Sequence, residues 1–255
     1  MKKSDIAASF GRSAKNYDSA ALLQKSVGEK LLSHLNNFSI YPETILDLGS
    51  GTGYLTKKIS RRFPDAHILS LDLSYEMLKF SSNRYPICAD ADALPLKSHS
   101  VDLIFSNLML QWSQNLSQTF DEIKRIINPS GYFMFTTLGS ETLREWRSAW
   151  KTVDEYPHVH EFHNKNTIER KLKSSGFSPV FLETSYSQLK FSSLQESMNH
   201  TRQIGAYNLN DSRHRGLMGK NKFRQFISVY ENFRDIEGHF PVTYEVITCI
   251  AKVFS

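Results

Sequence analysis

Hydrophobic and polar positions along the chain follow two periods, one typical of buried strands and one typical of amphipathic helices. Short apolar runs at residues 45–48, 67–71, 101–106, 132–138, 179–189 and 243–254 predict strands, and the apolar pair that begins the stretch 87–96 predicts the third one. Apolar positions three or four residues apart predict helices at 4–17, 20–35, 55–63, 115–127, 143–153 and 167–175. Because strands and helices alternate up to residue 138, we expect an α/β fold with a mostly parallel, seven-stranded sheet and helices on both faces.

Residues 190–240 separate the last two predicted strands and have a mostly helical pattern. This segment is too long for a hairpin, so we expect an inserted helical cap over the strand ends. Together with the helices of residues 1–38, the cap should close a pocket above a core at residues 41–138. With 255 residues and 40% hydrophobic content, residues 1–255 are expected to form a single domain.

The stretch at residues 45–55, ILDLGSGTGYL, predicts a buried strand that turns sharply into a helix. Its glycines follow Asp47 at every second position: Gly49, Gly51 and Gly53. Glycine allows a ligand to approach the backbone closely, and the free N–H groups of the helix point at the same place. A dinucleotide fingerprint requires a small residue where Tyr54 stands, which argues against NAD or FAD and against a nicotinamide oxidoreductase.

Acidic residues follow the second and third predicted strands. Asp72 should lie beside the glycine turn, because ligands of open parallel sheets bind at the carboxyl ends of the strands. A carboxylate there can accept hydrogen bonds from both hydroxyls of a ribose, and the alternative is a cap for a helix at residues 74–82. Asp90 and Asp92 follow the third strand. Asp92 stays unassigned, with a solvated loop residue as the alternative.

The acid followed by G-x-G-x-G resembles the first motif of class I methyltransferases that use S-adenosyl-L-methionine, which have a Rossmann-like fold. The resemblance implies this cofactor, with Asp90 accepting from the adenine amino group. The cofactor-binding residues implied are Asp47, Gly49, Ser50, Gly51, Gly53, Asp72, Leu73, Asp90, Ala91 and Asn107. Methyltransferases that act on amines carry an Asn/Asp-Pro-Pro-aromatic run after the fourth strand. This chain has Asn107-Leu108-Met109, which favours an oxygen or carbon acceptor.

Further motifs resemble a more specific family, nearly end to end from Phe10 to Lys252. They are FGRSAKNY at 10–17, SNL at 106–108 with QW at 111–112, FTTL at 135–138, AW at 149–150, VDE at 153–155, PH at 157–158, IGA at 204–206 and FPVTY at 240–244. This pattern closely resembles the malonyl-[acyl-carrier-protein] O-methyltransferases of early biotin synthesis. The resemblance implies methylation of the free carboxylate of a malonyl thioester on acyl carrier protein, giving the malonyl methyl ester that primes pimeloyl synthesis.

A malonyl carboxylate is already ionised at neutral pH, so no general base is expected, and the protein has to align the reactants and exclude water. Arg202 is the candidate cation for this carboxylate, with a surface arginine as the alternative. Tyr17 is the candidate to wall off water and donate a hydrogen bond, with a core tyrosine as the alternative. Arg12 lies on the same N-terminal segment and is also a candidate for contact with the cofactor or the acceptor.

The net charge is +5, without the long basic tracts of a nucleic-acid binder. One basic run contains no acid and is either a solvated face or a docking surface for an acidic carrier protein: Arg213, Arg215, Lys220, Lys222 and Arg224. No stretch reaches the roughly 18 apolar residues of a membrane helix, and no signal peptide is apparent. We therefore expect a cytoplasmic protein that binds neither nucleic acid nor membrane.

Cys88 and Cys249 each lie in an apolar run, which predicts buried free thiols. His158, His160 and His163 cluster without an acid or cysteine at ligand spacing, so no metal site is expected. Three alternative functions stay open. They are methylation of a small free carboxylic acid such as trans-aconitate, methylation of a quinone-ring carbon, and cofactor binding without catalysis.

Overall fold

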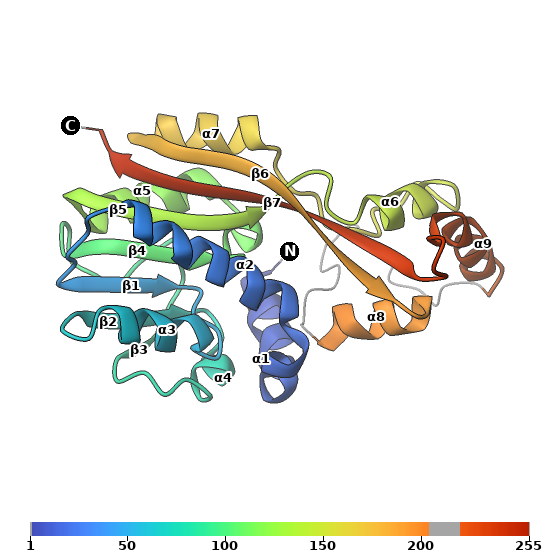
Figure 1. Cartoon of the computed structure of the whole chain (residues 1–255), viewed down its shortest axis with the longest axis horizontal. Coiled ribbons are helices and arrows are strands. Elements are labelled where there is room, and N and C mark those ends of the chain that lie inside the picture. Colours follow the sequence, from blue (N-terminus) through green and yellow to red (C-terminus); the bar gives the residue numbers. More distant parts are fainter. Residues whose placement is uncertain (1, 204–219, 255) are drawn as a thin grey trace.

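The computed structural model describes residues 2–203 and 220–254. A twisted sheet occupies one half of the molecule, and its last two strands run on into a second half made mainly of helices (Figure 1). The strand order is β3 (Pro86–Cys88), β2 (His67–Asp72), β1 (Thr44–Leu48), β4 (Val101–Asn107), β5 (Ile127–Leu138), β7 (Phe240–Val253) and β6 (Phe177–Phe191). Only β7 is antiparallel to its neighbours β5 and β6. This confirms the predicted mostly parallel, seven-stranded sheet.

Helices cover both faces of the sheet, because successive side chains of a strand point to opposite faces. The helices, in chain order, are α1 (Lys3–Ala20), α2 (Leu22–Ser33), α3 (Tyr54–Arg62), α4 (Tyr75–Leu78), α5 (Leu116–Ile126), α6 (Arg144–Lys151), α7 (Lys165–Ser174), α8 (Leu194–Gln203) and α9 (Lys220–Tyr230). Apolar residues of α2 and α3 pack with Leu103 and Phe105 on one face. Those of α5 and α7 pack with Ile104 and Phe133 on the other. Among the described residues, no helix is long and apolar enough to span a membrane.

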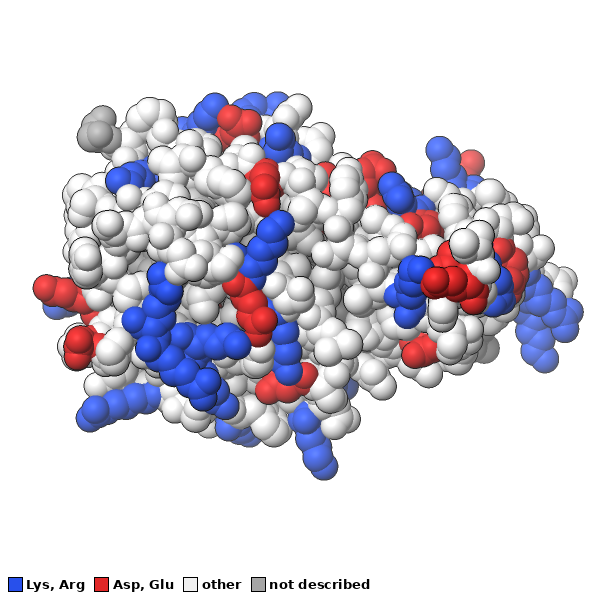
Figure 2. Space-filling model, viewed as in Figure 1, with Lys and Arg blue, Asp and Glu red and all other residues white. Residues whose placement is uncertain are grey.

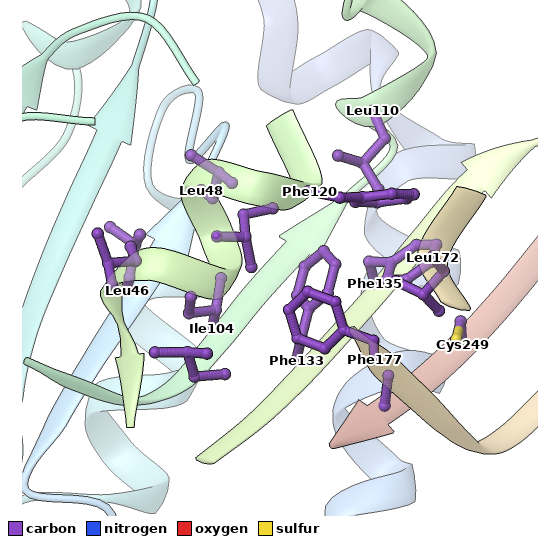
Figure 3. Packing of buried hydrophobic residues seen from close by; sticks show 14 of the residues in the cluster. Leu46, Leu48, Ile104, Leu110, Phe120, Phe133, Phe135, Leu172, Phe177 and Cys249 are labelled. Atoms are coloured by element: carbon purple, nitrogen blue, oxygen red, sulfur yellow. The ribbon is translucent and has the colours of Figure 1, made fainter. Parts of the chain in front are cut away.

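The larger core is centred on aromatic rings from a helix and two strands (Figure 3). Phe133 and Phe135 stack on β5 with ring centroids 4.7 Å apart. Phe120 of α5 lies 6.0 Å from Phe135, and Phe177 of β6 lies 5.7 Å from Phe133. All four side chains are fully buried, so this cluster holds β5 and the helix layer together.

Two local predictions differ from the structure. Residues 128–131, expected as a turn before the fifth strand, lie within β5. Val101 pairs with Ile127 and Leu103 with Tyr132, so the predicted turn is an irregularity in the strand opposite Asp102. The expectation that Cys88 is buried is wrong, because β3 is an edge strand and leaves its thiol exposed. The buried position of Cys249 on β7 is confirmed.

The N-terminal helices and the segment before the last strand meet above the strand tips. In this region Ser13 Oγ of α1 donates to the Arg202 backbone oxygen of α8 at 3.3 Å. Trp150 of α6 stacks on Phe226 of α9 at 4.1 Å. The motif at 204–206 and two members of the basic run, Arg213 and Arg215, lie outside the described residues.

Candidate active site

The three glycines of the turn between β1 and α3 all have positive φ, but they serve different ends. A Cβ added at Gly49 would lie 2.4 Å from Met109 Cγ, and one at Gly53 would lie 2.5 Å from Ser81 Oγ. These two glycines allow neighbouring segments to pack against the turn. At Gly51, where φ is 55°, an added Cβ meets nothing within 4 Å and would project into open space. Gly51 therefore leaves room for a ligand.

Asp72 fastens the glycine turn to the end of β2. Its Oδ2 accepts from the Gly51 N–H at 2.9 Å, and its Oδ1 accepts from the Ser74 N–H at 2.7 Å. Burial raises the pKa of Asp72, while the backbone N–H groups act in the opposite direction. The cap of α4 itself is Ser74, whose Oγ accepts from the Met77 N–H at 3.4 Å. Asp72 thus holds the glycine turn and is not itself the cap of α4. It accepts only from the backbone N–H of the cap residue, Ser74.

Asp47 lies beneath the turn and is almost fully buried. Its Oδ2 accepts from Thr56 Oγ1 at 2.5 Å. Burial raises the pKa of Asp47 to about 7, with the neighbouring Asp72 acting in the same direction. The carboxyl is thus positioned by α3 and shielded from water.

Two small cavities lie on either side of the glycine turn and share Tyr17, Gly49, Gly51 and Asn107 in their linings. The first, here the strand-tip cavity, has a volume of about 100 Å³. It also contains predicted residues from the ends of β2 and β3: Asp72, Leu73, Asp90 and Ala91. The second, here the glycine-turn cavity, has a volume of about 50 Å³ and includes Asp47 and Ser50. Gly53 is the one predicted cofactor residue that lines neither cavity.

The N-terminal helix closes the outer side of the strand-tip cavity through an ion pair that sequence reasoning missed. Lys3 Nζ lies 2.5 Å from Asp90 Oδ2 and 2.6 Å from Asp92 Oδ2. Burial lowers the pKa of Lys3, but the two carboxylates outweigh it and raise the pKa overall. The Asp92 side chain is 7% exposed and also accepts from the Thr119 hydroxyl, so it is not a solvated loop residue.

Asn107 ties the tip of β4 to the second helix. Its Nδ2 donates to the backbone oxygen of Gln24 at 2.9 Å, and its Oδ1 accepts from Thr136 Oγ1 at 2.8 Å. Both ends of the amide are therefore used within the protein, and Asn107 lines both small cavities. The predicted residue Asn107 lies at the site and positions α2 there.

A third cavity of about 750 Å³, here the large cavity, extends from the cofactor region toward α6 and α8. Four residues line both the strand-tip and the large cavity: Phe10, Tyr17, Leu108 and Trp112. Tyr17 lines all three cavities, and burial raises the pKa of its hydroxyl, which therefore stays protonated as a donor. Phe10 lies edge-on to Tyr17 and to Trp112, at 6.3 and 5.3 Å. The junction between the cavities is thus aromatic and apolar.

The two predicted cations, Arg12 and Arg202, both line the large cavity and have exposed side chains. Sequence reasoning missed the role of two histidines that line the same cavity. His158 Nε2 lies 2.7 Å from Asp154 Oδ1, and its ring stacks on Trp150 at 3.9 Å. His160 Nε2 lies 3.1 Å from the Gln111 backbone oxygen. The four-residue spacing of Asp154 and His158 was the signal in the sequence for this contact.

In the part of the chain that the structure describes, one group of acids and histidine has metal-ligand geometry: Asp235, Glu237 and His239. Lys190 Nζ lies 2.9 Å from Asp235 Oδ2 and 3.0 Å from Glu237 Oε2. An ammonium group thus already pairs with both carboxylates, and none of these three residues lines one of the three cavities.

The residues around the two small cavities fit S-adenosyl-L-methionine. Asp72 and Asp90 place carboxylates at one side of the glycine turn, and these would accept from the ribose hydroxyls and the adenine amino group of the cofactor. The open space over Gly51 would let the cofactor approach the backbone closely. The large cavity then meets this site at Tyr17, where a methyl acceptor can approach.

Comparison with known proteins finds methyltransferases similar to this chain. A family model described as "Methyltransferase domain" matches residues 46–135. A malonyl-[acyl-carrier protein] O-methyltransferase from Methylovorus sp. (strain MP688) is 37% identical over 260 residues, covering 97% of this chain and 88% of the relative. The biotin biosynthesis bifunctional protein BioHC from Cellvibrio japonicus (strain Ueda107) is 36% identical over 251 residues, covering 96% of this chain and 49% of that protein. The crystal structure of BH2331 from Bacillus halodurans C-125 shares the fold, with a TM-score of 0.63 at 14% identity, covering 89% of this chain and 100% of that chain.

Proposed function

The chain belongs to the malonyl-[acyl-carrier protein] O-methyltransferase family, and we propose that it methylates the free carboxylate of a malonyl thioester on acyl carrier protein. The methyl donor is S-adenosyl-L-methionine, and the product is the malonyl methyl ester that primes pimeloyl synthesis for biotin. The observation that carries this proposal is the junction at Tyr17, where a large cavity opens onto the two small cavities.

When bound, S-adenosyl-L-methionine supplies an electrophilic methyl group on a sulfonium. The acceptor carboxylate is ionised at neutral pH, so the protein does not have to remove a proton. An anion and a cation become neutral products, so a site that excludes water strengthens the attraction between them. Phe10 and Trp112 exclude water at the junction, and the Tyr17 hydroxyl donates a hydrogen bond to the acceptor. Orientation of the reacting atoms supplies the remaining rate enhancement.

We propose that the N-terminal helices and the described parts of the insertion, residues 190–203 and 220–240, form the cap that closes the large cavity. From this cap Arg202 is the cation that we propose for the malonyl carboxylate, supported by its position in the lining of the large cavity. Arg202→Gln should raise KM for the malonyl carrier without changing the affinity for S-adenosylhomocysteine. Arg170→Gln on α7 is the matched control, because Arg170 is exposed and lines none of the three cavities. Equal KM values for both variants would contradict this role.

The decisive experiment combines the protein with malonyl acyl carrier protein and methyl-labelled S-adenosyl-L-methionine. Mass spectrometry should find one labelled methyl group, located on the distal carboxylate of the thioester. Malonyl-CoA, trans-aconitate and a quinone serve as competing acceptors. A higher kcat/KM with trans-aconitate or the quinone, or no transfer to any acceptor, would refute the proposal in favour of the corresponding alternative.

The carrier protein is acidic, and the basic run that ends at Arg224 is the docking surface that we propose for it. Its described members on α9 are exposed: Lys220, Lys222 and Arg224. Lys222 Nζ lies 3.1 Å from Asp154 Oδ2, so the run adjoins the lining of the large cavity at His158. The cytoplasmic location stays a prediction.

Charge reversal tests the docking surface. Lys220→Glu combined with Arg224→Glu should raise KM for the carrier substrate at least about fivefold at low salt and leave the affinity for S-adenosylhomocysteine unchanged. Figure 2 shows other basic side chains gathered over the region of α2 and α3. Lys57→Glu with Arg61→Glu on α3 is therefore the matched control. Equal effects of the two double variants would mean that the carrier responds to overall charge.

A further inference from the structure

The side chain of Gln24 presents a buried oxygen that has no partner among the described residues. Its Oε1 accepts no hydrogen bond, although Gln24 lines both the glycine-turn cavity and the large cavity. Buried polar atoms of proteins are nearly always paired, so an unpaired one on a residue that lines a cavity indicates a ligand atom. Ser50 Oγ, in the lining of the same glycine-turn cavity, is also buried and unpaired.

Other polar side chains around this cavity are already engaged within the protein. Thr56 donates to Asp47, Thr52 Oγ1 donates to Asp18 Oδ1 at 2.6 Å, and the Tyr54 hydroxyl donates to Glu29. Asn107 uses both ends of its amide, as described above. Among the described residues of this lining, the two buried side-chain atoms without a partner are the acceptor oxygen of Gln24 and the hydroxyl of Ser50, which can donate.

We propose that Gln24 Oε1 accepts a hydrogen bond from the ammonium group of the methionine part of S-adenosyl-L-methionine. An amide oxygen is an acceptor only and an ammonium is a donor only, whereas the Ser50 hydroxyl can donate to the methionine carboxylate. An amino-acid group thus matches both unpaired atoms at once. The inference rests on the proposed function for the identity of the methyl donor.

The position of Gln24 is fixed before the ligand arrives. Its backbone oxygen accepts from Asn107 Nδ2, and one turn later α2 packs closely on α3. A Cβ added at Gly28 would lie 2.4 Å from a methyl carbon of Leu55, so α2 has no room to shift toward α3. The backbone that carries the Gln24 side chain is thus in place before the ligand binds.

The charges around the cavity favour an ammonium. The carboxyl groups of Asp18 and Asp47 are both in its lining, and an ammonium beside Asp47 would favour the ionised form of this carboxyl, whose pKa burial otherwise raises to about 7. The one lysine in the lining, Lys25, donates to the Asp18 backbone oxygen and lies over the Tyr54 ring, 4.7 Å from its centroid. Lys25 is thus directed to the rim of the cavity.

Calorimetry with S-adenosylhomocysteine tests the inference without any methyl acceptor. Gln24→Met keeps the size of the side chain and removes the acceptor, and should weaken binding about 10-fold to 100-fold. An analogue that lacks the amino group should bind wild type and Gln24→Met equally. Gln24→Glu retains an acceptor and should bind S-adenosylhomocysteine at least as tightly as wild type. Gln203→Met is the matched control, because Gln203 lines the large cavity but not the glycine-turn cavity.

Three results would overturn the inference: unchanged affinity of Gln24→Met, an equal loss for the two ligands, or a loss that disappears with the decarboxylated analogue instead of the deaminated one. If Gln24→Met does not fold, the comparison of Gln24→Glu with wild type on the two ligands decides, and weaker binding of S-adenosylhomocysteine refutes the assignment. Failure of wild type to bind S-adenosylhomocysteine would refute the methyl donor and this inference together. Binding without transfer to the malonyl carrier would contradict the proposed acceptor alone.

Discussion

Replacing Asp72 with alanine removes a carboxylate that has two tasks. Its oxygens accept from the Gly51 and Ser74 N–H groups at 2.9 and 2.7 Å. Each carboxylate oxygen offers about two acceptor positions, so one on each oxygen is left for a ribose hydroxyl. Asp72→Ala should therefore remove two hydrogen bonds to the ligand and also loosen the glycine turn.

The magnitude follows from these contacts. A hydrogen bond to a charged group contributes about 1.5–3 kcal/mol, so two would contribute roughly 3–6 kcal/mol. Asp72 is only partly buried, and water can occupy the space that its carboxylate vacates. The lower end of the range, about 3 kcal/mol, corresponds to an affinity for S-adenosylhomocysteine that is roughly 100-fold weaker.

Isothermal titration calorimetry measures this loss, with Asp102→Ala as the control. Asp102 Oδ2 accepts from the N–H groups of Glu43 and Thr44, both at 2.9 Å. This contact lies at the amino ends of the strands, opposite the strand ends that carry the site. Asp102→Ala thus loses as many backbone hydrogen bonds without touching the site, and should lower Tm while binding as wild type does. Affinity of Asp72→Ala within about threefold of wild type, or equal losses in both variants, would refute the reasoning.

Three further predictions concern single positions. Burial raises the pKa of Asp47 to about 7, so its neutral form stabilises the folded state fully below about pH 4. This stabilisation is lost as the pH rises from about 4 toward 7. In urea unfolding, Asp47→Asn should therefore gain stability relative to wild type as the pH rises through that window. Gly51→Ala should cost about 1–2 kcal/mol of stability but weaken S-adenosylhomocysteine binding at least about 10-fold, as calorimetry can measure. With a thiol reagent, Cys88 should react in the native protein, and Cys249 only after unfolding, because burial hides that thiol and raises its pKa.

Local signals in the sequence predicted the sheet and the glycine turn between β1 and α3. The glycine turn and the acids at the strand ends are read from spacing alone, and parallel strands bring their carboxyl ends to one edge. What spacing could not supply is the order of the strands. Cys88 lies in an apolar run typical of a buried strand, yet β3 has a neighbour on one side only, which exposes the thiol. Exposure of a strand residue depends on its neighbours in the sheet, and these are distant in sequence.

The wall of the large cavity depends on contacts between distant residues as well. Sequence periodicity predicts α1 as a helix but not where it lies. In the structure α1 is held at one end by Lys3 on Asp90, 87 residues away, and at the other by Asp18, which accepts from Thr52. Since α1 supplies Tyr17 to all three cavities, these end contacts determine both how the cofactor site is closed and where the acceptor meets it. The strand ends of the core thus form most of the site, and α1 completes it. The position of α1 depends on side-chain pairs between residues that are distant in the sequence.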